Sequence, residues 1–167
     1  MIVFDASTLI LIAKVDLLDL LLGPAGLPIA IPREVERECC GQKRSMDSLM
    51  IQRALDESRI IVVTVRSRGL VRKVQMDFGL GPGESEAIAL ALNENAQVLG
   101  IDDKNGINAA KLLGIPFTTA VGILVRSTEK GLLEVSDAVA KLAMLAKYGR
   151  YKESIIEDAR RKLEATP

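Results

Sequence analysis

The chain has 167 residues, of which 49% are hydrophobic and 26% charged, and its formal net charge is zero. This length is typical of one domain, and the apolar content argues against a disordered chain. Balanced charge argues against a domain that coats nucleic acid through bulk positive charge. We expect a single domain over residues 1–167 and no membrane-spanning helix, because every apolar run is shorter than the ~20 residues such a helix needs.

The absence of His and the adjacent positions of the two cysteines restrict the chemistry further. A chain without His excludes Ser–His–Asp and Cys–His nucleophile systems and His-ligated zinc. Cys39 and Cys40 are adjacent, which is unfavourable for a mutual disulfide, so we expect buried or half-buried thiols and a cytoplasmic protein. Met1–Ile10 contains Asp5 and no basic start, so we expect no secretory signal. An enzyme of this composition would use carboxylates, hydroxyls, Lys or Arg with a hard metal ion.

In the first half of the chain, short apolar runs typical of strands alternate with segments typical of helices. The predicted elements are a strand at Met1–Phe4, helices at Leu9–Ala13 and Leu17–Leu22 capped by Ser7 and Asp16, a turn at Gly23–Pro28, a strand at Ile29–Ile31, a helix from Pro32 to Cys39, a loop at Gly41–Ser45, a helix at Met46–Glu57, a strand at Ile60–Val63 and a helix at Arg66–Phe78.

The second half begins after a break at Gly79–Gly83. It contains a helix at Glu84–Asn93, a strand at Gln97–Ile101, a helix at Asn105–Leu113, a strand at Ile115–Thr118 and helices near Ala120–Lys130, Ser136–Lys147 and Lys152–Glu164. Such alternation predicts an α/β fold in which helices wrap a parallel sheet. We expect a core over about residues 1–125 and C-terminal helices over about 126–167.

Carboxylates follow two of the predicted strands. Asp5 ends the first, and Asp102 and Asp103 end the strand at Gln97–Ile101. Ligands of parallel sheets bind at the carboxyl ends of the strands, so these groups are expected to face one pocket. Each Asp taken alone is also a common helix cap, and Ser7 and Thr8 are capping residues that make Asp5 less necessary in that role.

Glutamates near two helix starts extend this set. Glu84 and Glu86 lie in the first turn of the Ala-rich helix. The simpler explanation for acidic residues at this place is their favourable interaction with the helix dipole. Residues two apart cannot share a helix face, so we expect Glu86 to point inward and Glu84 to act either as a cap or as a group that supports the metal ligands. Glu34 and Glu38 lie on one face of their predicted helix, and exposure of this charged face to solvent would be a sufficient explanation for them. A cluster of four such carboxylates is costly without a cation and suits Mg²⁺ or Mn²⁺.

Four segments resemble a PIN-domain ribonuclease, the fold of the VapC-type toxins of toxin–antitoxin pairs. They cover roughly residues 1–125 and consist of Ile2-Val3-Phe4-Asp5-Ala6-Ser7-Thr8-Leu9-Ile10, Ile31-Pro32-Arg33-Glu34-Val35-Glu36-Arg37-Glu38, Gly83-Glu84-Ser85-Glu86-Ala87-Ile88-Ala89-Leu90-Ala91 and Val98-Leu99-Gly100-Ile101-Asp102-Asp103-Lys104. The resemblance is to a branch with a G-E-x-E-A helix and a double Asp. One departure is Ile101, where many relatives carry Thr.

The resemblance implies hydrolysis of RNA with Mg²⁺ or Mn²⁺. It implies catalytic roles for Asp5, Glu38, Glu86 and Asp103, metal ligation by Asp5, Glu86, Asp102 and Asp103, and auxiliary roles for Ser7 and Glu84. The assignment within the Asp102–Asp103 pair stays open. An antitoxin and a homodimer are the protein partners that this family suggests.

Basic residues near the predicted site are candidates to bind the RNA backbone. They are Arg33, Arg37 and Lys104, with Lys14 nearby and a second cluster at Arg66–Lys73. Aromatic residues are scarce, so base stacking is not expected to dominate. Two apolar stripes, one from Val135 to Ala146 and one from Tyr151 to Leu163, are more typical of internal packing than of a partner surface.

Three other interpretations remain open from the sequence. The first is a PIN-like RNA-binding or regulatory module with a silent acidic cluster. The second is a haloacid-dehalogenase-like phosphatase, although Ser7 stands where that family has its second Asp. The third is a purely structural α/β domain. Activation by a divalent metal distinguishes the nuclease from the silent module.

Overall fold

A computed structural model describes residues 1–23, 27–41 and 45–166. The strands are β1 (Ile2–Phe4), β2 (Ile29–Pro32), β3 (Ile60–Val63), β4 (Val98–Gly100) and β5 (Phe117–Thr118). The helices are α1 (Ala6–Lys14), α2 (Leu18–Leu21), α3 (Arg33–Cys40), α4 (Met46–Asp56), α5 (Arg68–Phe78), α6 (Pro82–Asn93), α7 (Lys104–Leu112), α8 (Ala120–Glu129), α9 (Val135–Tyr148) and α10 (Glu153–Glu164).

The five strands form one parallel sheet in the order β3-β2-β1-β4-β5. Strand β1 is central, and Phe4 lies opposite Gly100 of β4. A Cβ at Gly100 would lie 2.2 Å from the Phe4 ring, so the glycine lets this ring cover the neighbouring strand. The backbone N–H of Asp5 continues the pairing with a 3.0 Å bond to the Gly100 carbonyl. The ends of β1 and β4 are therefore held side by side.

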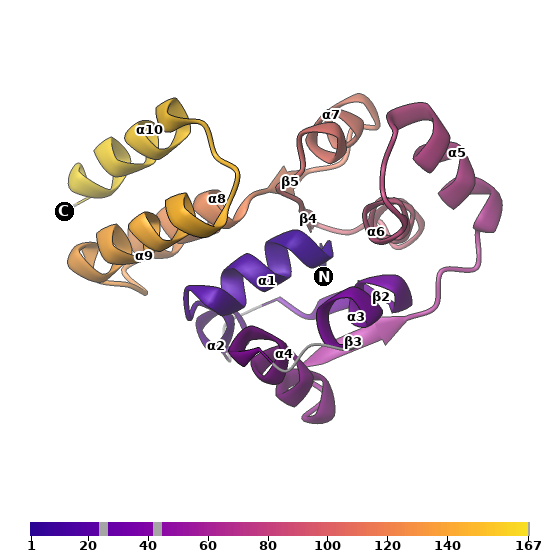
Figure 1. Cartoon of the computed structure of the whole chain (residues 1–167), viewed down its shortest axis with the longest axis horizontal. Helices are drawn as coiled ribbons and strands as arrows, with labels where there is room; N and C mark the ends of the chain where they lie inside the picture. Colours follow the sequence, from indigo (N-terminus) through magenta and orange to yellow (C-terminus); the bar gives the residue numbers. More distant parts are fainter. Residues whose placement is uncertain (24–26, 42–44, 167) are drawn as a thin grey trace.

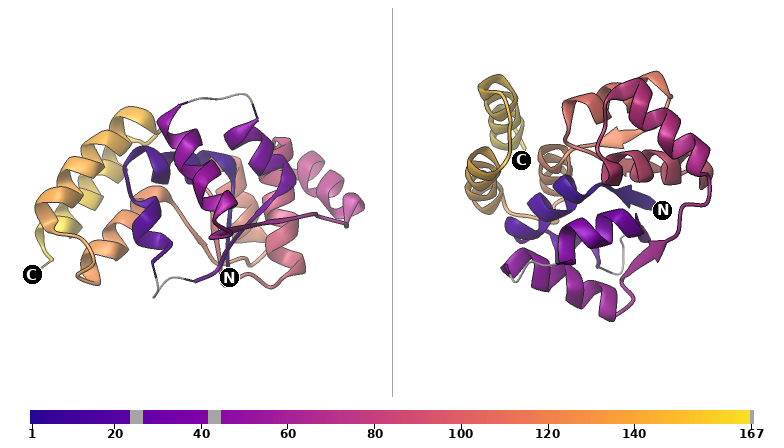
Figure 2. Two further views of the ribbon diagram at one scale, coloured as in Figure 1. Left: turned by 90° about the horizontal axis from the view of Figure 1, so that it is seen from below. Right: turned by 45° about the vertical axis from the view of Figure 1, so that its right-hand side comes forward.

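Helices cover the sheet in two groups, and a third group stands at one end (Figure 1). Helices α1, α3 and α4 pack on one another, and α5, α6 and α7 form the second group. The third group contains α8, α9 and α10, and both α9 and α10 pack on α8. Figure 2 shows α9 and α10 side by side at the edge of the molecule. The predicted α/β fold with a parallel sheet is confirmed.

The caps of the first two helices differ from the prediction. Asp5, not Ser7, is the N-cap of α1, and its side chain accepts from the Thr8 N–H. Asp16 has a φ of 56° and does not cap α2, which begins after Leu17 without a side-chain cap. The predicted turn at Gly23–Pro28 and loop at Gly41–Ser45 include residues 24–26 and 42–44, which lie outside the described residues.

The C-terminal stripes are mainly packing surfaces, as predicted. Leu142 and Leu163 are fully buried and Ala159 nearly so, whereas Ile155 is 45% exposed. Cys39 is a buried thiol and Cys40 a half-buried one, and they form no disulfide with each other, as expected. Among the described residues, no helix is long and apolar enough to cross a membrane.

Candidate active site

The Asp5 carboxylate lies at the end of the central strand and is completely buried. It accepts a 2.8 Å bond from the Thr8 N–H and a 2.7 Å bond from the Ser7 hydroxyl. Burial raises the pKa of Asp5 to about 7, because the loss of hydration outweighs these bonds, and the charge of Asp102 adds to the rise. Ser7 therefore contacts Asp5, in keeping with its predicted auxiliary role.

Asp102 lies beside Asp5 and is held by two donors. The Ala120 N–H at the start of α8 donates to it at 2.9 Å, and the Tyr151 hydroxyl donates to its other oxygen. Burial raises the pKa of Asp102 as well, although these donors oppose the rise. Two neighbouring carboxylates are thus both desolvated, an arrangement that favours binding of a cation.

The Thr8 hydroxyl lies between these two carboxylates. It lowers the pKa of both Asp5 and Asp102, yet its contacts with them lack the geometry of a hydrogen bond. Among the residues that the structure describes, it has no other partner. A buried hydroxyl without a partner is uncommon and requires an explanation. Carboxylate and hydroxyl oxygens are the ligands that Mg²⁺ and Mn²⁺ prefer, so this donor set fits a hard divalent ion.

Tyr151 reaches Asp102 from the segment between α9 and α10. Burial and the charge of Asp102 both raise the pKa of the phenol, so Tyr151 stays a neutral donor. Every described donor to Asp5 or Asp102 is uncharged, and among the described residues neither carboxylate forms an ion pair. No basic side chain of the described residues therefore competes with a cation for this pair.

Asp103 and Glu84 act as helix caps. Asp103 caps α7 by accepting a 2.9 Å bond from the Gly106 N–H. Glu84 reaches back to the Gly81 N–H at 2.8 Å in a capping box, as the sequence predicted. Of the two adjacent aspartates, the structure thus places Asp102, and not Asp103, beside Asp5.

Glu38 approaches the start of α6. It accepts a 3.1 Å bond from the Gly83 N–H, a position where the helix dipole favours a carboxylate. A Cβ at Gly83 would lie 2.6 and 2.7 Å from the two carboxylate oxygens. The glycine of the G-E-x-E-A segment is therefore required for this close approach.

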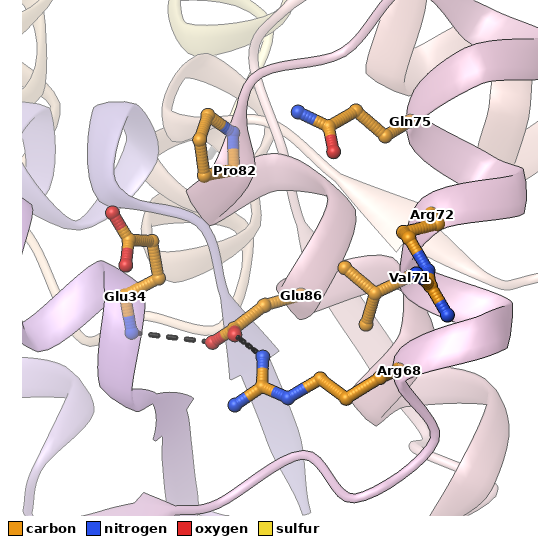
Figure 3. Close-up of a pocket in the computed structure, with 7 residues that line it drawn as sticks. All are labelled: Glu34, Arg68, Val71, Arg72, Gln75, Pro82 and Glu86. Carbon is orange, nitrogen blue, oxygen red and sulfur yellow. Dashed lines mark hydrogen bonds and ion pairs between the residues drawn. The ribbon is translucent and has the colours of Figure 1, made fainter.

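Glu86 is 6% exposed and points inward, as expected. Its carboxylate accepts a 3.2 Å bond from the Glu34 N–H at the start of α3 and forms an ion pair with Arg68 of α5 (Figure 3). It lines a cavity of about 430 Å³ whose other lining residues are Glu34, Arg68, Val71, Arg72, Gln75 and Pro82. Glu86 thus already has a cationic partner, unlike Asp5 and Asp102.

A family model described as a PIN domain matches residues 1–165. The chain belongs to the PIN-domain family. Comparisons with curated proteins and with solved structures gave no match. PIN domains are generally nucleases that use divalent metal ions. The membership of this chain in the family therefore supports nuclease-type activity and a divalent metal. It also favours this fold family over the haloacid-dehalogenase alternative.

The acidic residues of this PIN domain lie at several places at the carboxyl edge of the sheet. Asp5 and Asp102 are neighbours, whereas Glu38 and Glu86 contact α6 and α3 separately. Among the described residues, no three Asp, Glu, Cys or His side chains come close enough together to hold one metal ion. The predicted four-carboxylate cluster is not assembled in this structure, and the catalytic assignments stay predictions.

The candidate RNA-binding residues of this PIN domain are exposed. Arg33 donates to the Thr64 hydroxyl at 3.3 Å, and Arg37 forms an ion pair with Glu34 at 2.5 Å. Lys104 begins α7 directly after Asp103. Arg33 and Lys104 begin the helices that follow β2 and β4, and a role of these basic residues in RNA binding stays a prediction.

Sequence reasoning missed three residues at the site, namely Thr8, Tyr151 and Arg68. Thr8 is recognisable afterwards as a hydroxyl residue one helical turn beyond Asp5. Arg68 was only one member of a basic cluster. Tyr151 stands 49 positions from Asp102 in a segment without a motif, so no local pattern identifies it.

Proposed function

We propose that this PIN domain is an endoribonuclease that uses Mg²⁺ or Mn²⁺ to hydrolyse RNA phosphodiester bonds. The observation that carries this proposal is the pair of the buried Asp5 and the half-buried Asp102: among the described residues it is held by neutral donors alone, beside a Thr8 hydroxyl without a partner. Asp5, Asp102 and Thr8 would hold the ion. When bound, a divalent ion of this kind polarises a phosphate and lowers the pKa of a water molecule.

The protein groups around the pair orient it. Ser7 and the Thr8 N–H fix the Asp5 carboxylate, and the Ala120 N–H fixes Asp102. Each carboxylate oxygen keeps lone pairs that these bonds do not use. The charged oxygens are therefore pre-positioned for a cation, which reduces the rearrangement needed on binding.

Glu38 and Glu86 support a second role at the same edge of the sheet. Both accept from the first turn of a helix, so their positions are fixed by backbone N–H groups. We propose that they position water or a second ion near the scissile phosphate. In this proposal Arg68 releases Glu86 or contacts the phosphate itself, because the Arg68 side chain is 58% exposed and the residue lines the cavity.

Arg33, Arg37 and Lys104 are proposed to bind phosphates of the RNA backbone. Their exposure allows contact with a polyanion, and such contacts depend strongly on salt. We also propose a cytoplasmic location, supported by the two cysteine thiols, which form no disulfide with each other. A role as the toxin of a toxin–antitoxin pair, with an antitoxin partner, and a homodimer stay predictions.

Cleavage of labelled single-stranded RNA tests the proposal. The assay compares wild type, the Asp5→Asn variant and wild type with EDTA, each with Mn²⁺ or Mg²⁺. Cleavage by wild type that is lost in both other samples supports a metal nuclease. Equal cleavage in all three samples identifies a contaminating nuclease and refutes the proposal.

One observation favours a second candidate, a silent PIN module that binds RNA. Glu86 is neutralised by Arg68, and no three acidic groups gather among the described residues. A silent module would bind RNA with a salt-dependent affinity but would not cleave it with any divalent ion. RNA binding without turnover over a panel of Mg²⁺, Mn²⁺ and Co²⁺ would decide for this candidate.

A further inference from the structure

A single tyrosine connects the C-terminal helix pair to the candidate metal site. Figure 1 shows α9 and α10 joined by a turn at the end of the pair nearest the sheet. Tyr151 lies in this turn, and its hydroxyl donates to Asp102. The PIN family model extends over Tyr151, but the four motif segments that carry the resemblance end at Lys104, so this contact lies outside those motifs.

The Tyr151 bond fixes one Asp102 oxygen while the Ala120 N–H fixes the other at 2.9 Å. With both oxygens held, the carboxylate cannot rotate freely, and it remains beside Asp5. A hydrogen bond from a hydroxyl to an ionised carboxylate is among the stronger ones in proteins. Groups that orient a metal ligand in this way commonly change metal affinity when they are removed.

The chemical nature of the donor is important. A Lys or Arg at this place would form an ion pair with Asp102, as Arg68 does with Glu86, and would compete with a metal ion for the negative charge. The phenol supplies a hydrogen bond and no charge. It offsets part of the desolvation of Asp102 and leaves the carboxylate able to bind a cation.

The ring of Tyr151 is itself held in place by close packing. A Cβ at Gly149 would lie 2.3 and 2.7 Å from two carbons of the ring, so only glycine leaves room for it. Gly149 has φ −89° and ψ 167°, an extended conformation that any residue adopts. A substitution there would therefore move the ring without an unfavourable φ, although its Cβ would also lie 3.0 Å from the Leu145 carbonyl oxygen.

We propose that Tyr151 is a positioning residue that orients Asp102 for metal binding, so that the α9–α10 turn completes the site formed by the sheet. This inference rests on the proposed function, since it requires Asp5 and Asp102 to bind the ion. It assigns a role to the C-terminal helices that packing alone does not give them.

The inference is tested without any activity assay by the binding of Mn²⁺ to the full chain. Calorimetry or the electron paramagnetic resonance signal of free Mn²⁺ measures this binding. Tyr151→Phe removes only the hydroxyl, and we expect Mn²⁺ affinity to fall by about 10- to 100-fold. The matched control is Tyr148→Phe, which changes the other tyrosine, a 48% exposed side chain. We expect this control to bind Mn²⁺ within about twofold of wild type.

Gly149→Ala is a second variant that displaces the Tyr151 ring and keeps its hydroxyl. It should weaken Mn²⁺ binding in the same direction, and it keeps the test decisive if Tyr151→Phe does not fold. Thermal unfolding of the metal-free variants shows whether each is folded. A variant that is folded and binds Mn²⁺ as tightly as wild type, or more tightly, overturns the inference.

Terbium luminescence gives an independent measurement of position. The chain has two Tyr and no Trp, so Tb³⁺ emission excited through the protein arises from a tyrosine near the ion. We expect Tyr148→Phe to retain this emission at saturating Tb³⁺ and Tyr151→Phe to lose most of it. Emission that depends on Tyr148 instead overturns the inference. Wild-type protein that binds neither Mn²⁺ nor Tb³⁺ refutes the proposed function as well, whereas unchanged binding by Tyr151→Phe refutes the inference alone.

Discussion

Replacement of Asp5 by Asn should stabilise the metal-free protein and abolish its stabilisation by divalent ions. Asp5 is completely buried, and its pKa is raised from an ordinary 3.8 to about 7, first because of desolvation. A difference of this size corresponds to about 4 kcal/mol of unfavourable free energy when the group is ionised. Asn keeps the shape and the acceptor for the Thr8 N–H but carries no charge.

The pH dependence follows from the same raised pKa. Between about pH 4 and pH 7, the folded protein holds a proton on Asp5 that the unfolded chain releases, so the stability of wild type falls as the pH rises through this window. The variant lacks this contribution. We expect Asp5→Asn to be more stable than wild type by about 2–4 kcal/mol at pH 8, and the difference to shrink towards pH 4.

Urea unfolding at pH 4.5 and pH 8, with and without Mg²⁺, measures both effects. Mg²⁺ at 100 times its dissociation constant should stabilise wild type by about 2.7 kcal/mol and leave Asp5→Asn unchanged. Asp137→Asn, on the exposed face of α9, is the matched control and should change the stability by less than about 0.5 kcal/mol at either pH. A variant no more stable than wild type at pH 8 would show that the Asp5 charge is not destabilising, and the argument for a cation site would fail.

Three further predictions test other parts of the structure. Gly83→Ala should displace the exposed Glu38 carboxylate and change the free energy of unfolding by less than about 1 kcal/mol. It should nevertheless lower RNA cleavage at least tenfold, and unchanged cleavage would exclude a role for Glu38 at this position. Leu163→Ala should cost about 2–5 kcal/mol in urea unfolding, because Leu163 is fully buried, whereas the 45% exposed Ile155 should tolerate Ala at under about 1 kcal/mol; similar costs for both would mean that α10 is not docked as described. Cys40 should react with a thiol reagent at pH 8 more slowly in the folded protein than after unfolding in urea, because burial first and the nearby acidic groups second raise its pKa; equal rates would contradict this environment.

The sequence by itself determined the α/β class and the order of most elements, because these elements have a clear local signal. Ile60–Val63 is a run of β-branched residues, and its predicted bounds are those of β3. The break at Gly79–Gly83 and the Ala-rich run after it locate α6, and Asp5 and Asp102 follow strands that apolar runs identify. Because parallel strands end at one edge of the sheet, even the meeting of Asp5 with the double Asp, about a hundred residues away, could be expected.

Only the tertiary structure decided which carboxylates are neighbours. Asp102 and Asp103 both lie after the end of β4, where side-chain direction depends on the turn into α7 and not on strand alternation. One becomes a helix cap and the other meets Asp5. The contact of Tyr151 with Asp102 depends on how α9 and α10 pack on α8, and the pairing of Arg68 with Glu86 depends on where α5 lies against α6. Long-range packing of this kind leaves no periodic trace in the sequence, because a single polar contact needs only one residue at the right place in space.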